Sequence, residues 1–379
     1  MARIDIVFPG AHLPQDGIGD HTRWLAEGLG VRHDVTVLGR GKGGDIPNAE
    51  YADVWGARPL RDLGGLRRYL STQHPDLLVI QFEQFSYGPR GFNPDLPRVV
   101  RWARRTMPRT RVLVFMHETY TMPTRAGTAA MWTYQRPQAR GLVRNASQVF
   151  HSCDGGLSRL GKLNRASSVV PVPSNIVRVA TDPASERLRW GIDQDAFVVG
   201  TFGHITEPRL LQLVPMLRAI SEIRPITLAY VGKDVAMADR LRPEVRGRLV
   251  TFERPSPADV SRLLSTFDLA LAPFIDGVSA RRGSFAALVD HGVPTVTNRG
   301  ANTDRFLVDL AKMGLFELST NDLLAETAAR LAASDPQRDA LRTAALANRD
   351  LMPSRASTVE AVEACLPPVQ VGAGPALDT

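Results

Sequence analysis

The chain has 379 residues, which at roughly 100 to 200 residues per domain predicts two or three compact units. Apolar residues make up 44% and charged residues 22%, so the composition excludes a collagen-like, coiled-coil or wholly disordered chain. No stretch reaches the ~18 uninterrupted apolar residues that a membrane span needs, and the N-terminus lacks the layout of a signal peptide. We therefore expect a cytoplasmic protein.

The net charge of +7 is unevenly distributed. Residues 1–176 hold 23 basic and 14 acidic side chains, whereas residues 177–379 hold 23 basic and 25 acidic ones. The basic front half predicts attraction to a phosphorylated ligand, an acidic acceptor or an anionic membrane surface. Only four of the 46 basic residues are lysine, a bias that favours a GC-rich bacterial genome over a nucleic-acid surface.

The number and spacing of the cysteines argue against a disulfide scaffold and against a zinc site. Cys153 and Cys365 are far apart in the sequence, and no Cys or His pair has the spacing of metal ligands. This arrangement is typical neither of a disulfide scaffold nor of a zinc site.

Short apolar runs alternate with longer segments through the first half of the chain. The run 3–8 ends in Pro-Gly, a helical segment follows at 22–29, and the run 34–38 completes a β-α-β opening. Further strands are predicted at 77–81, 112–116, 149–151 and 168–171. Alternating strands and helices predict a parallel sheet with helices on both faces.

The pattern restarts at residue 197. Strands are predicted at 197–203, 227–231, 249–252, 269–273 and 295–297, with helices at 210–220 and 285–291. A second Rossmann-like sheet is therefore expected, and ligands of such sheets bind outside the carboxyl ends of the strands.

The two patterns predict the domain organisation. We expect an N-terminal Rossmann-like domain at 1–176 and a C-terminal one at 177–345, joined near 175–182. A C-terminal helix at about 346–366 is expected to pack back onto the first domain. Residues 367–379 are typical of a disordered tail.

The loop after the first predicted strand is rich in glycine. Gly17 and Gly19 let the backbone approach a ligand closely, and the amides of the following helix suit an anion. Thr22 occupies the third glycine position of the dinucleotide pattern, so an ordinary tight turn explains the segment equally well.

Titratable side chains follow two other predicted strands of the first half. His117 and Glu118 come after 112–116, where a histidine could donate or accept a proton near neutral pH. Glu83 is a similar candidate after 77–81. The alternatives are a surface-loop histidine and a carboxylate that caps a helix or pairs with an arginine.

Two cations follow neighbouring predicted strands of the second half. Arg209 stands near a helix start after 197–203, and Lys233 stands two residues after 227–231. Together they provide what a diphosphate requires, although either one alone would more often be a solvated surface charge.

The most distinctive segment is 276–284, Asp-Gly-Val-Ser-Ala-Arg-Arg-Gly-Ser. It places a carboxylate, two hydroxyls, two guanidiniums and two glycines at one strand end, a mixture that few structural roles need. Ser284 suits a helix N-cap, and one of Arg281 and Arg282 is expected to face water.

The run from Arg98 to Arg111 holds six arginines and Trp102. It predicts either a basic helix face for an acidic lipid or acceptor, or simply a solvated helix. Aromatics interleaved with basic residues are otherwise sparse, so we expect no nucleic-acid partner.

Taken together, these segments resemble the GT-B glycosyltransferases, specifically the retaining family four, which uses nucleotide-sugar donors. The resemblance covers residues 3–345 and rests on the order and spacing of the motifs 17–22, 75–81, 115–118, 203–209, 268–273 and 290–296. It implies an α/β fold of the GT-B type, in which two Rossmann-like domains with parallel sheets face each other across a deep cleft.

The resemblance also implies an activity and a set of site residues. The enzyme would move a sugar from a nucleotide-diphosphate donor to an acceptor hydroxyl with retention, without a metal or other cofactor. Donor diphosphate and nucleotide contacts would come from Gly19, His204, Arg209, Lys233, Ser279, Arg281, Arg282 and Ser284. The catalytic positions would be His117 and Asp276, and the acceptor side would hold His21, Glu83 and Glu118.

The donor loop departs from the family pattern of two glutamates. Asp276 can stand for the first, but the second falls on Ser284, so Arg281 or Arg282 is an alternative phosphate ligand. Two other functions stay open: a sugar-nucleotide epimerase of the same fold, and a catalytically inactive binding or partner subunit.

The acceptor is expected to be a small molecule, a glycan or a lipid-linked compound, in natural-product or cell-envelope glycan biosynthesis. The basic first domain favours peripheral contact with the inner face of a membrane.

Overall fold

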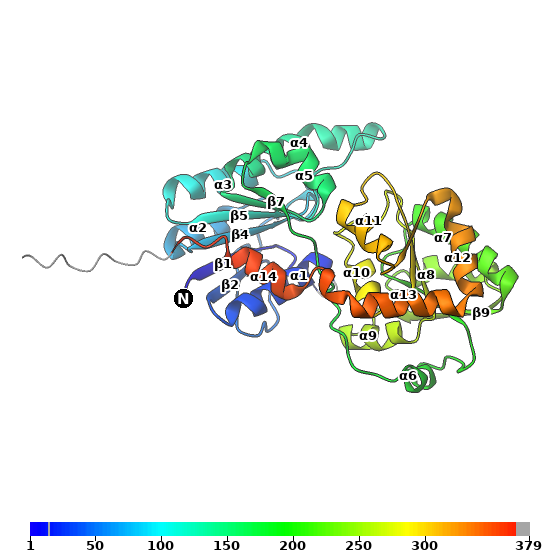
Figure 1. Ribbon diagram of the computed structural model, residues 1–379. Coiled ribbons are helices and arrows are strands. Elements are labelled where there is room, and N and C mark those ends of the chain that lie inside the picture. The colour runs from blue at the N-terminus through cyan, green and yellow to red at the C-terminus, as the bar shows by residue number, and fades with distance from the viewer. Residues whose placement is uncertain (14–15, 369–379) are drawn as a thin grey trace, which may run out of the picture. The chain divides into compact units, whose positions relative to one another are not determined.

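The computed structural model describes residues 1–13 and 16–368, which form two α/β units (Figure 1). The first unit comprises Met1–His151, Arg159–Ser168 and the chain from Val359 onward, and the second comprises Ser152–Ser158 and Val169–Thr358. The tail predicted at 367–379 lies outside the described residues from position 369 on.

The first unit is built on a seven-stranded sheet. Its strands are β1 (Arg3–Val7), β2 (Asp34–Gly39), β3 (Glu50–Asp53), β4 (Leu77–Phe82), β5 (Arg111–Met116), β6 (Gln148–His151) and β7 (Ser167–Val169). Their order is β3-β2-β1-β4-β5-β6-β7, and the pairs from β3 to β6 are parallel. The order reverses between β1 and β4, which makes that point the switch point of the sheet.

Helices cover both faces of this sheet. They are α1 (Gly17–Gly30), α2 (Gly64–Gln73), α3 (Asp95–Thr106), α4 (Ala126–Asn145) and the short η1 (Pro89–Gly91) and η2 (Gly161–Leu163). Two further helices, α5 (Asp154–Leu160) and α14 (Arg355–Glu363), begin in the second unit and end in the first. Helices α2, α3 and α4 pack on one face, and α1 lies on the other, where the ring of His21 contacts Phe115.

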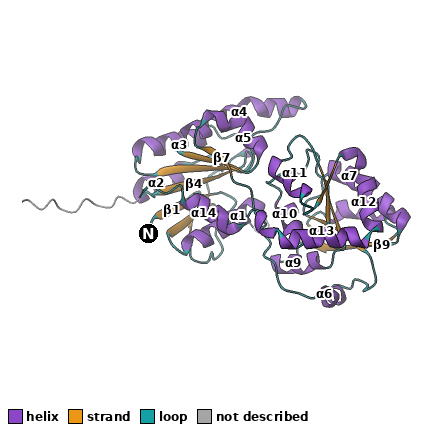
Figure 2. Cartoon of the chain, viewed as in Figure 1, coloured by secondary structure: helices purple, strands orange, loops and turns teal. Residues whose placement is uncertain are grey.

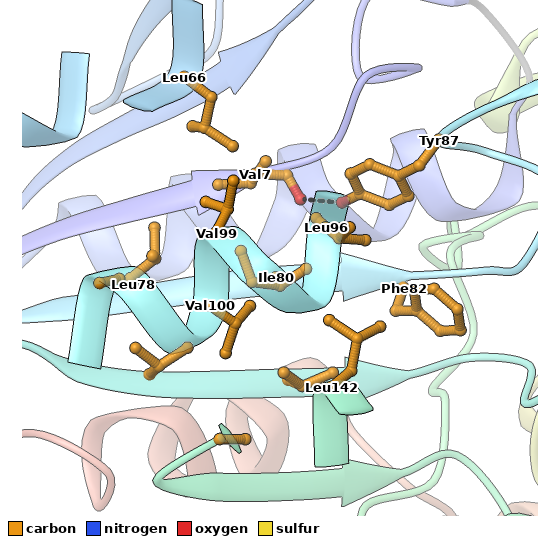
Figure 3. Packing of buried hydrophobic residues seen from close by; sticks show 14 of the residues in the cluster. Val7, Leu66, Leu78, Ile80, Phe82, Tyr87, Leu96, Val99, Val100 and Leu142 are labelled. Atoms are coloured by element: carbon orange, nitrogen blue, oxygen red, sulfur yellow. Dashed lines mark hydrogen bonds between the residues drawn. The ribbon is translucent and has the colours of Figure 1, made fainter. Parts of the chain in front are cut away.

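The core beneath α2, α3 and α4 is made of aliphatic side chains from the strands and the helices (Figure 3). Val7, Leu78 and Ile80 come from the strands and are fully buried. The buried Tyr87 hydroxyl donates to the backbone oxygen of Val7 at 3.0 Å and to that of Gln81 at 2.8 Å. A buried hydroxyl is thereby satisfied, and the loop after β4 is held against the sheet.

The second unit has a six-stranded, fully parallel sheet. Its strands are β8 (Val198–Phe202), β9 (Ile226–Gly232), β10 (Gly247–Glu253), β11 (Leu269–Ala272), β12 (Thr295–Asn298) and β13 (Glu317–Ser319). Their order is β10-β9-β8-β11-β12-β13, so the switch point lies between β8 and β11.

Helices cover both faces of the second sheet as well (Figure 2). They are α6 (Pro183–Arg189), α7 (Glu207–Ile223), α8 (Val235–Asp239), α9 (Pro257–Ser265), α10 (Gly283–Asp290), α11 (Arg305–Lys312), α12 (Leu324–Ala333), α13 (Asp335–Ala347) and the short η3 (Arg242–Glu244), η4 (Asn321–Leu323) and η5 (Arg349–Leu351). In β11, Leu269 and Leu271 pack with α7 and α12, whereas Ala270 and Ala272 face α9, α10 and α11.

Two strands that the sequence pattern did not predict lie at the edges of the sheets. Strand β3 has only exposed or half-buried residues, and β13 has three residues of which one is buried. Edge strands are short and partly solvated, so they lack the continuous apolar run by which buried parallel strands are recognised.

Helix α1 begins five residues earlier than the predicted start at residue 22. Asp16 is its N-cap, and the Asp16 side chain accepts from the backbone N–H of Ile18 at 3.0 Å and of Gly19 at 2.7 Å. The glycines of the loop are thus the first turn of the helix, because a capping carboxylate satisfies amides that have no partner within the helix.

No helix among residues 1–13 and 16–368 combines the length and apolarity needed to cross a bilayer.

Asp5 is a buried acid in the middle of β1. Its side chain is 0% exposed, and its nearest cation is the Arg3 Nε at 3.8 Å. Burial raises the pKa of the Asp5 carboxyl to about 7, although the Arg3 charge opposes the shift. Asp5 has its ordinary pKa of 3.8 in the unfolded chain, so between pH 3.8 and about 7 the folded protein keeps a proton that the unfolded chain releases. The free energy of unfolding therefore falls as the pH rises through this range.

We expect Asp5→Asn to raise the unfolding midpoint at about pH 8, where the native carboxylate is charged and poorly solvated, and to change it far less at about pH 4. Thermal unfolding of both proteins across this range measures the difference. Asp45→Asn, at an exposed position, is the matched control. An equal gain at both pH values would mean that packing, and not ionisation, is responsible.

Candidate functional site

The switch point of the second sheet gathers the loops that follow β8, β9 and β11. The backbone N–H of Gly203 donates to the Val231 oxygen at 2.9 Å, so the loops after β8 and β9 lie side by side. A side chain at Gly203 would meet the Ser284 Cβ at 3.0 Å, which brings the start of α10 to the same place. Ligands of open parallel sheets bind at such points.

Arg209 is the buried cation of this site. It is 5% exposed, and its guanidinium donates to the backbone oxygen of His204 at 2.7 Å and to Thr201 Oγ1 and the Phe202 oxygen at 3.2 Å each. Among residues 1–13 and 16–368 no carboxylate contacts this guanidinium, although the charge of Asp234 acts on it without a direct contact. Burial lowers the pKa of Arg209 to about 10, so the side chain is still charged at neutral pH.

Phe274 holds two arginines at the site. The guanidinium carbons of Arg209 and Arg282 lie 5.5 and 4.9 Å from the centre of its ring. The Phe274 backbone is in turn clamped by Asn298, which accepts from its N–H at 2.7 Å and donates to its oxygen at 2.6 Å. Two guanidiniums are therefore held against one aromatic ring, and of the two only Arg282 also contacts a carboxylate, that of Asp276.

Asp276 is surrounded by donors. Its carboxylate accepts from Arg281 at 2.7 Å, from Arg282 at 2.8 Å and from the Asn302 amide at 2.7 Å. Burial acts to raise the pKa of Asp276, but Arg282, Asn302 and Arg281 outweigh it and the pKa lies below its ordinary value. One of the two arginines was expected to face water; both bind this carboxylate, and the Arg281 and Arg282 side chains are 14% and 31% exposed.

Ser284 is not the N-cap of α10. That position is Arg282, whose side chain makes no capping hydrogen bond, and Ser284 stands within the first turn. The turn starts beside Gly203, whose φ of 94° suits only glycine without strain. The positive end of α10 therefore lies close to Arg209, and a helix N-terminus favours a negative ligand.

His204 and Lys233 extend the site along the edges of β8 and β9. The His204 Nδ1 lies 2.6 Å from a carboxylate oxygen of Asp234, which also accepts from the Ile205 N–H at 3.0 Å. Burial acts to raise the pKa of Asp234, but the contacts with His204 and Ile205 lower it overall. Lys233 is exposed and precedes this carboxylate directly.

Ser279 and Ala280 show how the loop 276–284 is held. The Ser279 hydroxyl is buried and, among the described residues, has no hydrogen-bond partner. The Ala280 N–H donates to Asp304, the N-cap of α11, at 2.6 Å. Asp304 also accepts from the Asp154 N–H, so one buried carboxylate fastens two segments.

Asp304 and Asn298 were missed by the sequence analysis. An aspartate directly before the helical segment of α11 is an N-cap signal that could have identified Asp304. Nothing in the sequence near Asn298 indicates that its side chain clamps Phe274, because that contact joins two strand ends that are distant along the chain.

The first unit holds a second cluster, of two histidines and a glutamine, at its own switch point. The His117 Nε2 lies 2.6 Å from the Gln81 oxygen, and the Gln81 nitrogen lies 3.3 Å from the His21 Nδ1. The two histidine rings are 4.8 Å apart, edge to face. Burial lowers the pKa of His117 to about 3, so the ring is neutral at physiological pH.

Of the other predicted residues of the first unit, Glu83 and Glu118 follow strands β4 and β5, and Gly19 lies in the first turn of α1. Glu83 accepts from the Phe85 N–H at 2.9 Å and the Ser86 hydroxyl at 2.8 Å, and burial raises the pKa of its carboxyl. Glu118 is half-buried after β5. The Gly19 amide is bound by Asp16. The structure thus divides the predicted residues into two groups, one in each unit.

Comparison with known proteins supports the fold and the resemblance. Residues 16–175 match the family model described as a glycosyl transferase 4-like domain. A comparison with curated protein sequences finds no significant match.

Three solved structures illustrate the similarity. HepE of Anabaena in complex with UDP and glucose is 17% identical, with a TM-score of 0.67 over 97% of this chain and 99% of that one. Sucrose-phosphate synthase from Thermosynechococcus elongatus is 12% identical, with a TM-score of 0.73 over 96% and 98%. A glycosyltransferase from Rickettsia africae is 12% identical, with a TM-score of 0.62 over 96% and 98%.

The chain therefore has the GT-B fold, with one parallel-sheet α/β unit of seven strands and one of six. The predicted fold class and the resemblance to the family-four glycosyltransferases are confirmed.

We expect Gly203→Ala to lower the free energy of unfolding by about 2 kcal/mol, because it combines an unfavourable backbone angle with a clash against Ser284. Gly191→Ala is the matched control, since Gly191 also has a positive φ but a side chain there would meet nothing within 4 Å. It should cost about 1 kcal/mol. Denaturant unfolding measures both, and equal losses would show that the approach to Ser284 is not tight.

Proposed function

We propose that this protein is a glycosyltransferase that moves a sugar from a nucleotide-diphosphate donor to an acceptor hydroxyl with retention of configuration. The observation that carries the proposal is the buried, charged guanidinium of Arg209, which has no carboxylate partner among the described residues. A buried charge is costly unless an opposite charge pairs with it. A diphosphate that binds there supplies that charge.

The leaving group of such a reaction is a nucleotide diphosphate, so catalysis depends mainly on stabilising negative charge. Arg209 and Arg282, which share Phe274, would bind the diphosphate together with the exposed Lys233. The first turn of α10 would add backbone amides. The UDP and UDP-glucose in the HepE complexes support a donor of this class.

Asp276 would orient hydroxyl groups of the donor sugar. Its two oxygens already accept from Arg281, Arg282 and Asn302, which leaves little acceptor capacity for a sugar hydroxyl. The phosphate of an incoming donor can release such an arginine, because the phosphate competes with the Asp276 carboxylate for it. We propose that donor binding draws Arg282 from Asp276 to the phosphate and frees one carboxylate oxygen.

In the first unit, His117 would contact the donor sugar or the reacting acceptor as a neutral hydrogen-bonding group. Its lowered pKa of about 3 makes proton transfer to it near neutral pH unfavourable. His21, Glu83, Glu118 and the start of α1 at Gly19 would shape the surrounding surface. The acceptor is proposed to belong to natural-product or cell-envelope glycan synthesis.

One observation favours a second function, a catalytically inactive partner subunit. The donor loop has Ser284 where the second glutamate of the family falls, and the remaining carboxylate, Asp276, is occupied by three donors. Product analysis with and without an acceptor separates the cases. Transfer needs the acceptor, an epimerase converts the donor alone, and an inactive subunit binds the nucleotide without consuming it.

We expect Arg209→Met to weaken the binding of UDP, GDP, TDP or ADP, whichever binds the wild type, by about 10-fold to 100-fold, because a charged hydrogen bond contributes about 1.5 to 3 kcal/mol. Calorimetry measures the affinity directly. A thermal-shift screen first identifies the base, since a ligand at 100 times its dissociation constant adds about 2.7 kcal/mol of stability.

Arg218→Met is the control for this experiment. Arg218 lies on the same helix as Arg209 but is 64% exposed and pairs with Glu244, away from the loops of the site. Its replacement should leave nucleotide binding unchanged. Unaltered affinity in Arg209→Met, with the fold intact, would contradict the proposal.

We further propose that transfer requires no metal ion, because the cations of the second unit neutralise the diphosphate. Activity should therefore persist after exhaustive treatment with EDTA and should not rise when Mg²⁺ or Mn²⁺ is added. A loss of turnover that Mn²⁺ restores would contradict this part of the proposal and would point to a metal-bound diphosphate.

A further inference from the structure

Two adjoining hollows lie between α3 and α4 of the first unit, and neither contains a residue of the proposed transferase site. Their volumes are about 430 and 640 Å³. Both are lined by Arg101, Thr133, Pro137 and Gly141, so they form one continuous groove. We refer to it as the α3–α4 groove.

The floor of the groove follows from the way the two helices pack. Thr133, Pro137 and Gly141 are spaced four residues apart and therefore form one stripe on α4. A side chain at Gly141 would meet the Pro97 Cβ at 3.0 Å, so glycine permits the close approach of α3. The short side chains of Thr133 and Pro137, and the absence of one at Gly141, leave the groove open above this contact.

One half of the α3–α4 groove is mainly apolar. Its apolar lining consists of Phe92, Pro94, Pro97, Tyr134 and Pro137, and the polar side chains beside them are Arg98, Arg101, Thr133 and Gln138. Phe92 is 43% exposed, and its ring contacts Tyr134 edge to face at 5.3 Å. An aromatic residue left this exposed beside three prolines is available to an apolar ligand.

The other half is basic. It is lined by Arg101, Arg136, Arg140 and Arg144, and no acidic residue lines it. Arg101 lies 3.4 Å from the Asn145 amide oxygen, and Arg136 packs over Trp132. Within the described chain, the side chains of Arg140 and Arg144 have no hydrogen-bond or ion-pair partner, and α4 contains no acidic residue.

An apolar surface that continues into four arginines fits a partner that carries an anionic head and an apolar body. We propose that the α3–α4 groove docks the protein on a membrane surface rich in anionic lipids, with the arginines on the headgroups and Phe92 toward the acyl region. Basic side chains near such a surface each strengthen binding severalfold. The groove and the proposed transferase activity are independent of each other.

Single-stranded nucleic acid fits this surface less well. Bases bind to aromatic faces placed among the cations, whereas here Phe92 and Tyr134 pack against each other in the apolar half. The Tyr134 hydroxyl also donates to the Arg90 oxygen at 2.8 Å, which fixes the ring in place.

The test is co-sedimentation of the full chain with vesicles of phosphatidylcholine, either alone or with about 30% phosphatidylglycerol. We expect binding only to the anionic vesicles, decreasing as salt is added because the attraction is electrostatic. The double variant Arg140→Ala/Arg144→Ala should bind about 30-fold more weakly. Phe92→Ser should retain the salt-sensitive part of binding and lose the part that persists at high salt.

Arg61→Ala/Arg68→Ala is the matched control, since it removes two exposed positive charges from the same unit outside the groove. This control should bind anionic vesicles nearly as well as the wild type. The unfolding midpoint of every variant should equal that of the wild type, because the replaced side chains are exposed or half-buried. An equal loss in this control would overturn the proposal and assign binding to net charge alone. Failure to bind anionic vesicles, or tighter binding to a single-stranded oligonucleotide, would also overturn it.

Discussion

The chemistry of the second unit depends on one electrostatic constraint, which is a buried guanidinium that no carboxylate of the described residues contacts. Arg209 donates to backbone oxygens at the end of β8 and in the loop after it, and it stacks on Phe274, so its position is fixed while Asp234 offsets its charge only without a direct contact. Backbone oxygens and an aromatic face stabilise a cation only in part. An anion that binds at the switch point of the second sheet would offset the rest of the cost of burying this charge.

The neighbouring loop is held by a network of side chains that keeps charge in place. Asn298 clamps Phe274, Asn302 binds Asp276, and Asp304 holds the backbone at Ala280. All three follow or end β12, so this strand supports the loop that follows β11. The first unit differs, because its polar cluster of His21, Gln81 and His117 is buried and contains no lysine, arginine or carboxylate, and burial lowers the pKa of His117 to about 3. The two units therefore offer different chemistry at equivalent points of similar sheets.

Much of the fold could be predicted from sequence because central parallel strands are buried on both faces. Their apolar runs, such as 77–81 and 269–273, appear in the structure within one residue of the predicted bounds. The edge strands β3 and β13 could not be predicted in this way, because they are short and partly solvated. Helix α1 started early because the Asp16 cap, and not hydrophobic periodicity, determines its first turn.

For the candidate site, the sequence by itself determined which chemical groups follow which strands: the cations after β8 and β9, and the mixed loop 276–284 after β11. Only the tertiary structure decided how these groups pair. It placed both Arg281 and Arg282 on Asp276, left Arg209 without a contacting carboxylate among the described residues, and assigned the support of the loop to residues that end or follow β12. The reason is that the order of groups along a chain follows from local patterns, whereas pairing depends on distances between loops that meet only when the sheet has formed.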